Sequence, residues 1–144
     1  MQKNIRLAVV MAPLAFIGAM SPLHAEWRFE GFMSPTGNIV CAVYFEDGFP
    51  QTLICEIGEH TSADPPPPSD CDGDWGGTFS VEKRGDTAQL NCVTDSIRAD
   101  YPIIGYGSTW ENGGFKCEVE RQGVTCRNQD GHGFFLSKAE REMF

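Results

Sequence analysis

The sequence predicts an all-β fold, in which antiparallel hairpins form a small disulfide-stabilised sandwich or barrel-like sheet, with a short C-terminal helix. Three observations support this prediction. Apolar and polar residues alternate along much of the chain, turn-forming residues separate the alternating runs, and the six cysteines are spread along the same part of the chain. Alternation with a period of two places every second side chain on one face, which is typical of a strand with one buried side.

The first 25 residues have the pattern of a secretory signal peptide. Two basic residues precede an apolar run at 7–20, and a polar stretch follows it as far as Ala25. The run is too short to span about 30 Å of hydrocarbon comfortably, so we expect no integral membrane segment after cleavage. We therefore predict a signal peptide at 1–25 and a single β-rich domain at 26–144, which is exported to the periplasm or secreted.

The exported domain is predicted to be strongly acidic. The chain has 11 basic and 20 acidic residues and a net charge of −9, and its first 25 residues include two of the basic residues and none of the acidic ones. Cleavage after Ala25 therefore leaves 119 residues with a net charge of −11. Such a domain repels the phosphate backbone and offers no basic stripe, which argues against nucleic acid as a partner.

The alternating runs define the expected strands, and turn residues join them into hairpins. In chain order the runs are 39–45, 53–57, 88–92, 115–119 and 124–126. Turn signals stand between them at Asp47-Gly48, Arg84-Gly85-Asp86 and Gln122-Gly123, and each of these marks a hairpin. About three hairpins are therefore expected.

All six cysteines lie in the exported part and are predicted to form three disulfides, because export delivers them to an oxidising compartment. They are Cys41, Cys55, Cys71, Cys92, Cys117 and Cys126. A zinc site would need closer pairs, since the nearest two cysteines are nine positions apart. All except Cys71 are in phase with an apolar face and are expected to point inward. We predict neither a metal nor a cofactor.

The hairpins favour one disulfide pairing. A third hairpin that turns on Arg121-Gln122 places Cys117 directly opposite Cys126, where cross-strand Cβ atoms come close to bridging distance. The same reasoning with a longer loop pairs Cys41 with Cys55. Cys71 is then left to pair with Cys92, which gives a sequential connectivity.

Two segments break the strand pattern. The run 64–69 includes four consecutive prolines and is expected to form extended polyproline II in a surface loop. Near the C-terminus, Ser137 and Glu140 have the spacing of a capping box, which predicts a short helix over 138–143. Met143 and Phe144 are expected to dock this helix on the sheet.

Four residues other than the cysteines are candidates for a functional site. His132 lies in a glycine-flanked turn, where Asp130 or Asp95 could orient it as a general base. The simpler interpretation is a histidine whose ring binds backbone in a tight turn, because no nucleophile motif accompanies it. Trp110 lies in an expected loop at 107–114 and could stack on a sugar or a peptide. We assign no catalytic residue.

The acidic run at 70–76 matches a calcium loop only in part. Asp70, Asp72 and Asp74 occupy the first, third and fifth positions of such a loop. However, Trp75 stands where the sharp turn requires glycine, and Val81 stands where a bidentate glutamate is needed. We therefore interpret the run as a solvated acidic turn and predict no metal there.

Several short motifs follow one another in a fixed order through the exported part. They are Phe32-x-Ser34-Pro35-Thr36-Gly37-Asn38-Ile39-x-Cys41, Cys55-Glu56-Ile57, Asp74-Trp75-Gly76, Phe115-x-Cys117, Gly123-Val124-Thr125-Cys126 and Gly131-His132-Gly133-Phe134-x-Leu136-Ser137. This order resembles a family of small exported bacterial domains of unknown function. The resemblance implies export and disulfide bonding and transfers no catalytic residue. The sequence departs from the family at Arg141, where the family has an aromatic residue.

These observations favour a non-enzymatic module that binds a protein or another ligand of the cell envelope. Two alternatives stay open. One is a small hydrolase or metal-dependent enzyme that uses His132 with a carboxylate. The other is an inhibitor-like scaffold that presents the proline run to a protease or an envelope protein.

Cleavage after Ala25 can be tested directly. When the full chain is expressed with export, the mass of the recovered protein is expected to equal that of 119 residues from Glu26, less six hydrogens for three disulfides. Intact-protein mass spectrometry before and after reduction measures both quantities. A recovered chain that still carried residues 1–25 would contradict the predicted signal peptide.

Overall fold

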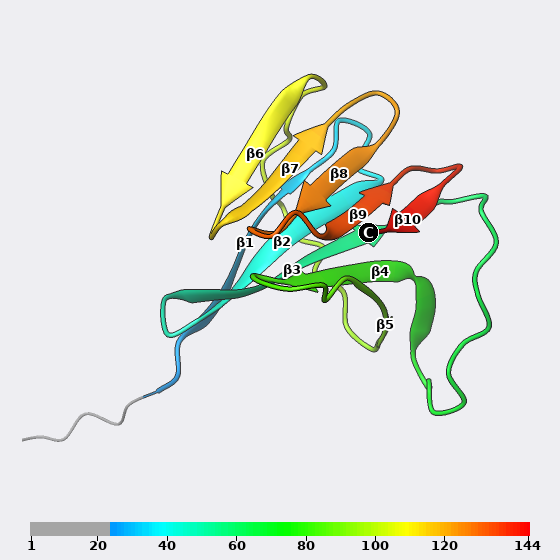
Figure 1. Ribbon diagram of the computed structural model, residues 1–144, viewed down its shortest axis with the longest axis horizontal. Helices are drawn as coiled ribbons and strands as arrows, with labels where there is room; N and C mark the ends of the chain where they lie inside the picture. The colour runs from blue at the N-terminus through cyan, green and yellow to red at the C-terminus, as the bar shows by residue number, and fades with distance from the viewer. Residues whose placement is uncertain (1–23) are drawn as a thin grey trace, which may run out of the picture.

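Two five-stranded antiparallel sheets pack face to face, and each sheet is a simple meander (Figure 1). The structure is a computed structural model that describes residues 24–144. Sheet A comprises β1 (Trp27–Met33), β2 (Ile39–Glu46), β3 (Phe49–Ile57), β4 (Asp74–Glu82) and β5 (Gln89–Val93). Sheet B comprises β6 (Ser108–Asn112), β7 (Phe115–Val119), β8 (Val124–Arg127), β9 (Gly133–Leu136) and β10 (Arg141–Met143).

This architecture confirms the predicted all-β core of antiparallel hairpins. The strands are more numerous than the sequence suggested, since β1, β4, β6, β9 and β10 were not among the five predicted runs. Apart from its last two residues, the predicted signal peptide lies outside the described part. Within residues 24–144 no helix is long and apolar enough to cross a membrane.

The predicted C-terminal helix over 138–143 is wrong, because residues 24–144 are without any helix and this segment includes β10. Ser137 and Glu140 do interact, but as the ends of a hairpin turn. The Ser137 Oγ accepts a hydrogen bond from the Glu140 N–H (2.9 Å), and the Ser137 N–H donates to the Glu140 carbonyl (2.7 Å). A hydroxyl that bonds the backbone three residues on serves a turn as well as a helix start. Pairing with β9 decides between the two.

The predicted disulfide pairing is confirmed: Cys41–Cys55, Cys71–Cys92 and Cys117–Cys126. Cys117 and Cys126 face each other across the hairpin that turns on Arg121-Gln122, as expected. The β2–β3 hairpin needs one more device. Its two-residue turn, Asp47-Gly48, has positive φ at both positions (50° and 81°), as a type I′ turn requires.

A β-bulge brings the first disulfide into register. The Asp47-Gly48 turn alone would place Cys41 opposite Ile54. The pairing shifts by one residue between Tyr44 and Phe45, so Cys41 lies opposite Cys55 instead. The two Cα atoms are then 4.0 Å apart, and the disulfide bridges neighbouring strands directly.

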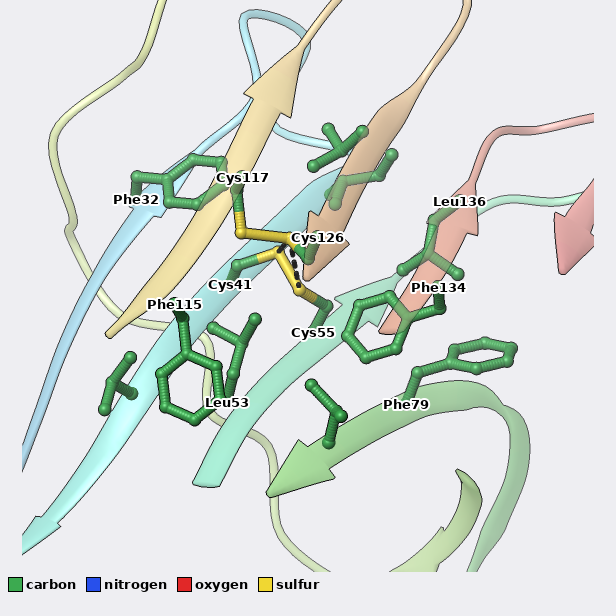
Figure 2. Packing of buried hydrophobic residues seen from close by; sticks show 14 of the residues in the cluster. Phe32, Cys41, Leu53, Cys55, Phe79, Phe115, Cys117, Cys126, Phe134 and Leu136 are labelled. Atoms are coloured by element: carbon green, nitrogen blue, oxygen red, sulfur yellow. Dashed lines mark hydrogen bonds between the residues drawn. A yellow bond between two sulfur atoms is a disulfide. The ribbon is translucent and has the colours of Figure 1, made fainter. Parts of the chain in front are cut away.

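The two cross-strand disulfides touch each other at the centre of the sandwich (Figure 2). The Cys126 sulfur lies 3.9 Å from the Cys41 sulfur and 3.7 Å from the Cys55 sulfur. No sulfur in a disulfide carries a hydrogen, so the contacts dashed in Figure 2 are van der Waals contacts. All four cysteines of this disulfide stack are 0 % exposed. The stack therefore joins the inner faces of the two sheets.

Cys92 does not share this burial. It was expected on the apolar face of its strand, but it is exposed, and Cys71 is only half-buried. The β4–β5 ladder is irregular between Asp74 and Thr78, which breaks the alternation that the sequence implied. The Cys71–Cys92 disulfide therefore lies at the periphery of sheet A.

A crossover segment, residues 94–107, connects the sheets and covers part of the outer face of sheet A. Its Ser96 hydroxyl and Ile97 N–H both donate to the Glu56 carboxylate of β3, each at 2.7 Å. Further along, the Met33 N–H of β1 donates to the Pro102 carbonyl (2.9 Å), and the Ile104 N–H donates to the Met33 carbonyl (3.0 Å). The segment thus closes one end of the β1 edge before it enters sheet B.

Replacing Cys117 and Cys126 by alanine is expected to cost more stability than replacing Cys71 and Cys92. Loop length alone gives the opposite order, because the sequence separations are 9 and 21, and the longer loop is worth about 0.7 kcal/mol more in the chain-entropy model. The buried pair also vacates core volume, which costs roughly 1 kcal/mol per cysteine. Urea unfolding of the oxidised variants measures both losses. A larger loss for the peripheral pair would contradict the packing role of the stack.

Candidate functional site

A groove of about 560 Å³ opens at one end of the sandwich, where turns of both sheets meet. We call it the turn groove. Three turns line it, namely the β1–β2 turn at 34–38, the β7–β8 turn at 120–123 and the β9–β10 turn at Ser137-Lys138. Glu59, which follows β3, Tyr106, at the end of the crossover segment, and the strand residues Ile39 and Val124 complete the lining. Four residues of the sequence motif at 34–38, namely Ser34, Thr36, Gly37 and Asn38, therefore form a wall of the turn groove.

Hydrogen bonds hold this wall in one conformation. The buried Ser34 hydroxyl accepts from the Ile39 N–H (3.1 Å), and the Ser34 carbonyl accepts from the Gly37 N–H (2.8 Å). Gly37 has a φ of 72°, which a residue with a side chain adopts only with strain. The Arg98 guanidinium of the crossover segment donates to the carbonyls of Gly37 and Asn38, at 2.9 and 2.8 Å.

Asn38 joins the wall to the neighbouring loop. Its Oδ1 accepts from the Glu59 N–H (2.7 Å) and its Nδ2 donates to the Glu59 carbonyl (2.9 Å). An amide side chain that pairs with both backbone groups of one residue acts like a short piece of sheet. The conformation of this wall of the turn groove is thus fixed by side-chain hydrogen bonds to backbone.

The charged residues of the turn groove are mostly paired. The Lys138 ammonium donates to the Glu59 carboxylate at 2.9 Å, and this hydrogen bond lowers the pKa of Glu59. The Arg121 guanidinium lies 4.8 Å from the centre of the Tyr106 ring, a cation–π distance. Glu59 therefore stays ionised at neutral pH, and the groove offers hydroxyls, amides, one aromatic ring and the exposed Glu120 carboxylate to a ligand.

The structure places His132 outside this groove, in the β8–β9 turn. Its Nδ1 lies 3.7 Å from the Asp86 carboxylate, which is itself 78 % exposed. The ring is not bonded to backbone as the simpler interpretation expected, because the turn backbone is held by another residue. Buried Asn128 accepts from the N–H groups of Asp130 and His132, both at 3.0 Å.

Asp130 joins this turn to the β4–β5 hairpin. Its carboxylate accepts from the Gly85 N–H and from the Arg84 guanidinium, both at 2.8 Å. The hydrogen bond from the Gly85 N–H, and to a smaller extent the one from the Arg84 guanidinium, holds the pKa of Asp130 below its ordinary value. A carboxylate stabilised in this way is a poor proton acceptor and cannot act as a general acid at neutral pH. Asp130 therefore acts as a tie between two hairpins.

Asp95 lies in a different cavity. This second cavity, of about 320 Å³, is lined by residues that include Glu56, His60 and Asp74. His60 is bonded through Nε2 to the Asp64 carboxylate (3.0 Å), and its Nδ1 has no hydrogen-bond partner. His132 and Asp130 do not line this cavity. The structure thus does not bring Asp95 together with His132.

Trp110 is part of β6 and not of a loop, so the expected loop at 107–114 is wrong. It lies opposite Cys117 in the β6–β7 ladder, and its ring centre is 4.9 Å from that of Phe32. Trp110 is half-buried and packs against the core. Because β6 is the edge strand of sheet B, the Trp110 ring covers the disulfide stack at that edge. This packing accounts for the residue without a ligand.

One cluster in residues 24–144 has metal-ligand spacing, namely Cys41, Cys117 and Cys126. All three are in disulfides, and a sulfur bound to another sulfur is not the thiolate that a metal ion needs. The acidic run at 70–76 does not form such a cluster.

Sequence reasoning missed two residues that organise the structure. Asn128 donates to the carbonyls of Glu82 (3.0 Å) and Gly85 (2.8 Å) besides accepting its two hydrogen bonds. Arg141, on β10, is 5 % exposed and binds the start of the proline run through Ser62, Ala63 and the Asp64 carboxylate. The Arg141 hydrogen bond lowers the pKa of Asp64.

The fold and the turn groove define a small all-β domain with three disulfides and one inter-sheet groove. Comparison with protein families identifies the family of the chain. The model of a family described as "Family of unknown function (DUF6636)" matches residues 14–144, and the chain belongs to this family. No curated protein and no solved structure matches the chain.

Asn128 and His132 provide a test of the β8–β9 turn. Asn128→Ala leaves four part-buried backbone groups without the partner that the Asn128 side chain provides, so we expect a loss of about 2–4 kcal/mol in the free energy of unfolding. His132→Ala is expected to change it by less than about 0.5 kcal/mol, since the ring makes only one long contact.

Urea unfolding near neutral pH measures both variants. Equal losses would contradict the assignment of the turn to Asn128. A large loss for His132→Ala alone would show that the imidazole holds the turn.

Proposed function

We propose that this protein is exported to the periplasm or secreted and acts there as a non-enzymatic binding module of the cell envelope. Its ligand site is the turn groove. The three disulfides support the location, because such bonds persist in oxidising compartments. The observation that carries the binding function is a rigid groove of about 560 Å³ between two sheets. Small-ligand sites typically have volumes of about 300–1,000 Å³.

The lining of the groove suits recognition better than catalysis. The carboxylate of Glu59 and the ammonium group of Lys138, which could otherwise exchange protons with a substrate, are already joined by a hydrogen bond of 2.9 Å. No histidine or cysteine is among the described residues that line it. Hydroxyl and amide groups from Thr36, Gln122 and Ser137 can donate or accept hydrogen bonds, and Tyr106 offers a ring face that is partly exposed.

The observations give no comparable support to the alternatives. In the hydrolase hypothesis, Asp95 lies in a cavity that His132 does not line. Asp130 lies in the same turn as His132, but its carboxylate is already bonded to Gly85 and Arg84. The proline run is exposed, but Trp75 Nε1 donates to the Pro65 carbonyl (2.8 Å) and Arg141 binds its start. These contacts give the run a structural role without a partner.

Filling the turn groove with a larger side chain is expected to prevent ligand binding. Gln122→Trp places a large side chain at the exposed tip of the β7–β8 turn, where it lines the groove. Gln89→Trp is the matched control, because Gln89 is exposed at the start of β5, away from the groove. Tyr106→Ala removes the ring face instead of filling the space.

Each immobilised, oxidised variant is incubated with a periplasmic extract, and bound proteins and glycans are identified by mass spectrometry. We expect one envelope component to be retained by the unchanged protein and by Gln89→Trp. Its retention by Gln122→Trp and Tyr106→Ala should fall about tenfold or more, which corresponds to the loss of a central contact. Equal retention by all four proteins would exclude the groove as the ligand site.

A further inference from the structure

The outer edge of β1 is an unpaired strand edge, and neighbouring hydrogen bonds show which of its residues face outward. Toward β2, the Glu26 carbonyl accepts from the Asp47 N–H (2.8 Å) and the Ser34 N–H donates to the Ile39 carbonyl (2.8 Å). Away from β2, both backbone groups of Met33 bond to the crossover segment. Even-numbered residues therefore pair with β2, and odd-numbered residues face outward.

By this alternation, the N–H and carbonyl groups of Trp27, Phe29 and Gly31 point away from sheet A. Over residues 27–31, β1 pairs with β2 alone, and within residues 24–144 the outward groups of these residues have no other backbone partner. The crossover segment covers the edge only from Met33 onward. Five residues, 27–31, thus form an open strand edge of the kind that adds a further strand.

We propose that a second copy of this chain pairs with this edge, so that β1 meets its two-fold-related β1 antiparallel and the two A sheets become one continuous sheet. Phe29 lies opposite Phe29 of the second copy, and Trp27 lies opposite Gly31. These are pairs of outward-facing residues, so each pair exchanges two backbone hydrogen bonds. The indole of Trp27 then covers a glycine, a recurring cross-strand combination.

Charge selects this register. Arg28 and Glu30 flank Phe29, and each is about two-fifths exposed. In the register centred on Phe29, Arg28 faces Glu30 of the second copy, and Glu30 faces its Arg28. The two neighbouring registers, in which one strand is shifted by two residues along the other, place Arg28 opposite Arg28 or Glu30 opposite Glu30. Like charges directly opposite are destabilising.

The exposed aromatic side chains support the same interface. Trp27 is 66 % exposed, although it is the first residue of β1 in sheet A. Its ring packs against Phe29 (6.4 Å between centres), and Phe29 packs against Tyr44 (5.5 Å). A second copy would extend this row of rings across the two-fold axis and bury it.

Charge reversal tests the pairing with the exported full domain. Arg28→Glu and Glu30→Arg each place like charges opposite in both cross-strand pairs, so self-association measured by sedimentation equilibrium should weaken about tenfold or more. A mixture of the two variants restores opposite charges in both pairs. We therefore expect the mixture to form a heterodimer at least as well as the unchanged protein self-associates.

The matched controls are Lys116→Glu and Glu118→Lys, because these residues form the same kind of ion pair two positions apart on β7 (3.2 Å). Both controls should associate like the unchanged protein. Phe29→Pro removes an outward N–H and leaves the β2 ladder intact, so it should give a folded monomer with all three disulfides.

Two results would overturn the proposal. One is an unchanged protein that stays monomeric at every concentration. The other is undiminished self-association of Arg28→Glu, Glu30→Arg and Phe29→Pro, each shown by its disulfide mass and near-ultraviolet circular dichroism to be folded.

Discussion

The contact between the two buried disulfides is the constraint on which the rest of the structure depends. Each disulfide joins two strands of its own sheet, and the sulfur of Cys126 touches both sulfurs of the other disulfide. The sheets are therefore centred on each other at one point, and the large core side chains surround it, as Figure 2 shows. Bulky sulfur pairs on facing strands fill the middle layer of a domain too small for a large hydrophobic core.

At the rims of the sandwich, hydrogen bonds from polar side chains hold neighbouring segments together instead. Asn112 donates to the Glu30 carboxylate (2.7 Å) where β6 passes β1, and Asn128 and Asp130 join the β8–β9 turn to the β4–β5 hairpin. At the groove end, Lys138 of sheet B meets Glu59 of the loop that follows β3. An apolar centre and hydrogen-bonded rims together set the distance between the turns that line the groove.

Much of the fold could be predicted because alternation and turn chemistry are local. The disulfide pairing followed from hairpin register for two bonds and from elimination for Cys71–Cys92, although the bulge beside Phe45 that aligns Cys41 with Cys55 has no clear sequence signal. The C-terminal helix failed because Ser137 and Glu140 have a spacing common to helix starts and hairpin turns. Only pairing with β9, a tertiary interaction, separates the two.

The candidate site was less predictable, because its parts come from distant segments. His132 and Asp130 drew attention as reactive residue types, whereas Asn128, which holds their turn, has an unremarkable side chain in an exposed-looking sequence. Arg141 stood out only as a departure from the family pattern. In the structure it binds a loop that lies almost 80 residues earlier in the chain. Long-range hydrogen bonds of this kind leave no periodicity to detect.

The sequential pairing of the cysteines has a consequence for biogenesis. Sheet A is complete by Val93, before the first residue of sheet B, and every disulfide joins cysteines that are neighbours in the chain. If the chain is exported as proposed, an enzyme that oxidises cysteines in the order in which they cross the membrane would form each native bond directly. The chain would then mature without a disulfide isomerase, and the second sheet would close over a first sheet that is already covalently fixed.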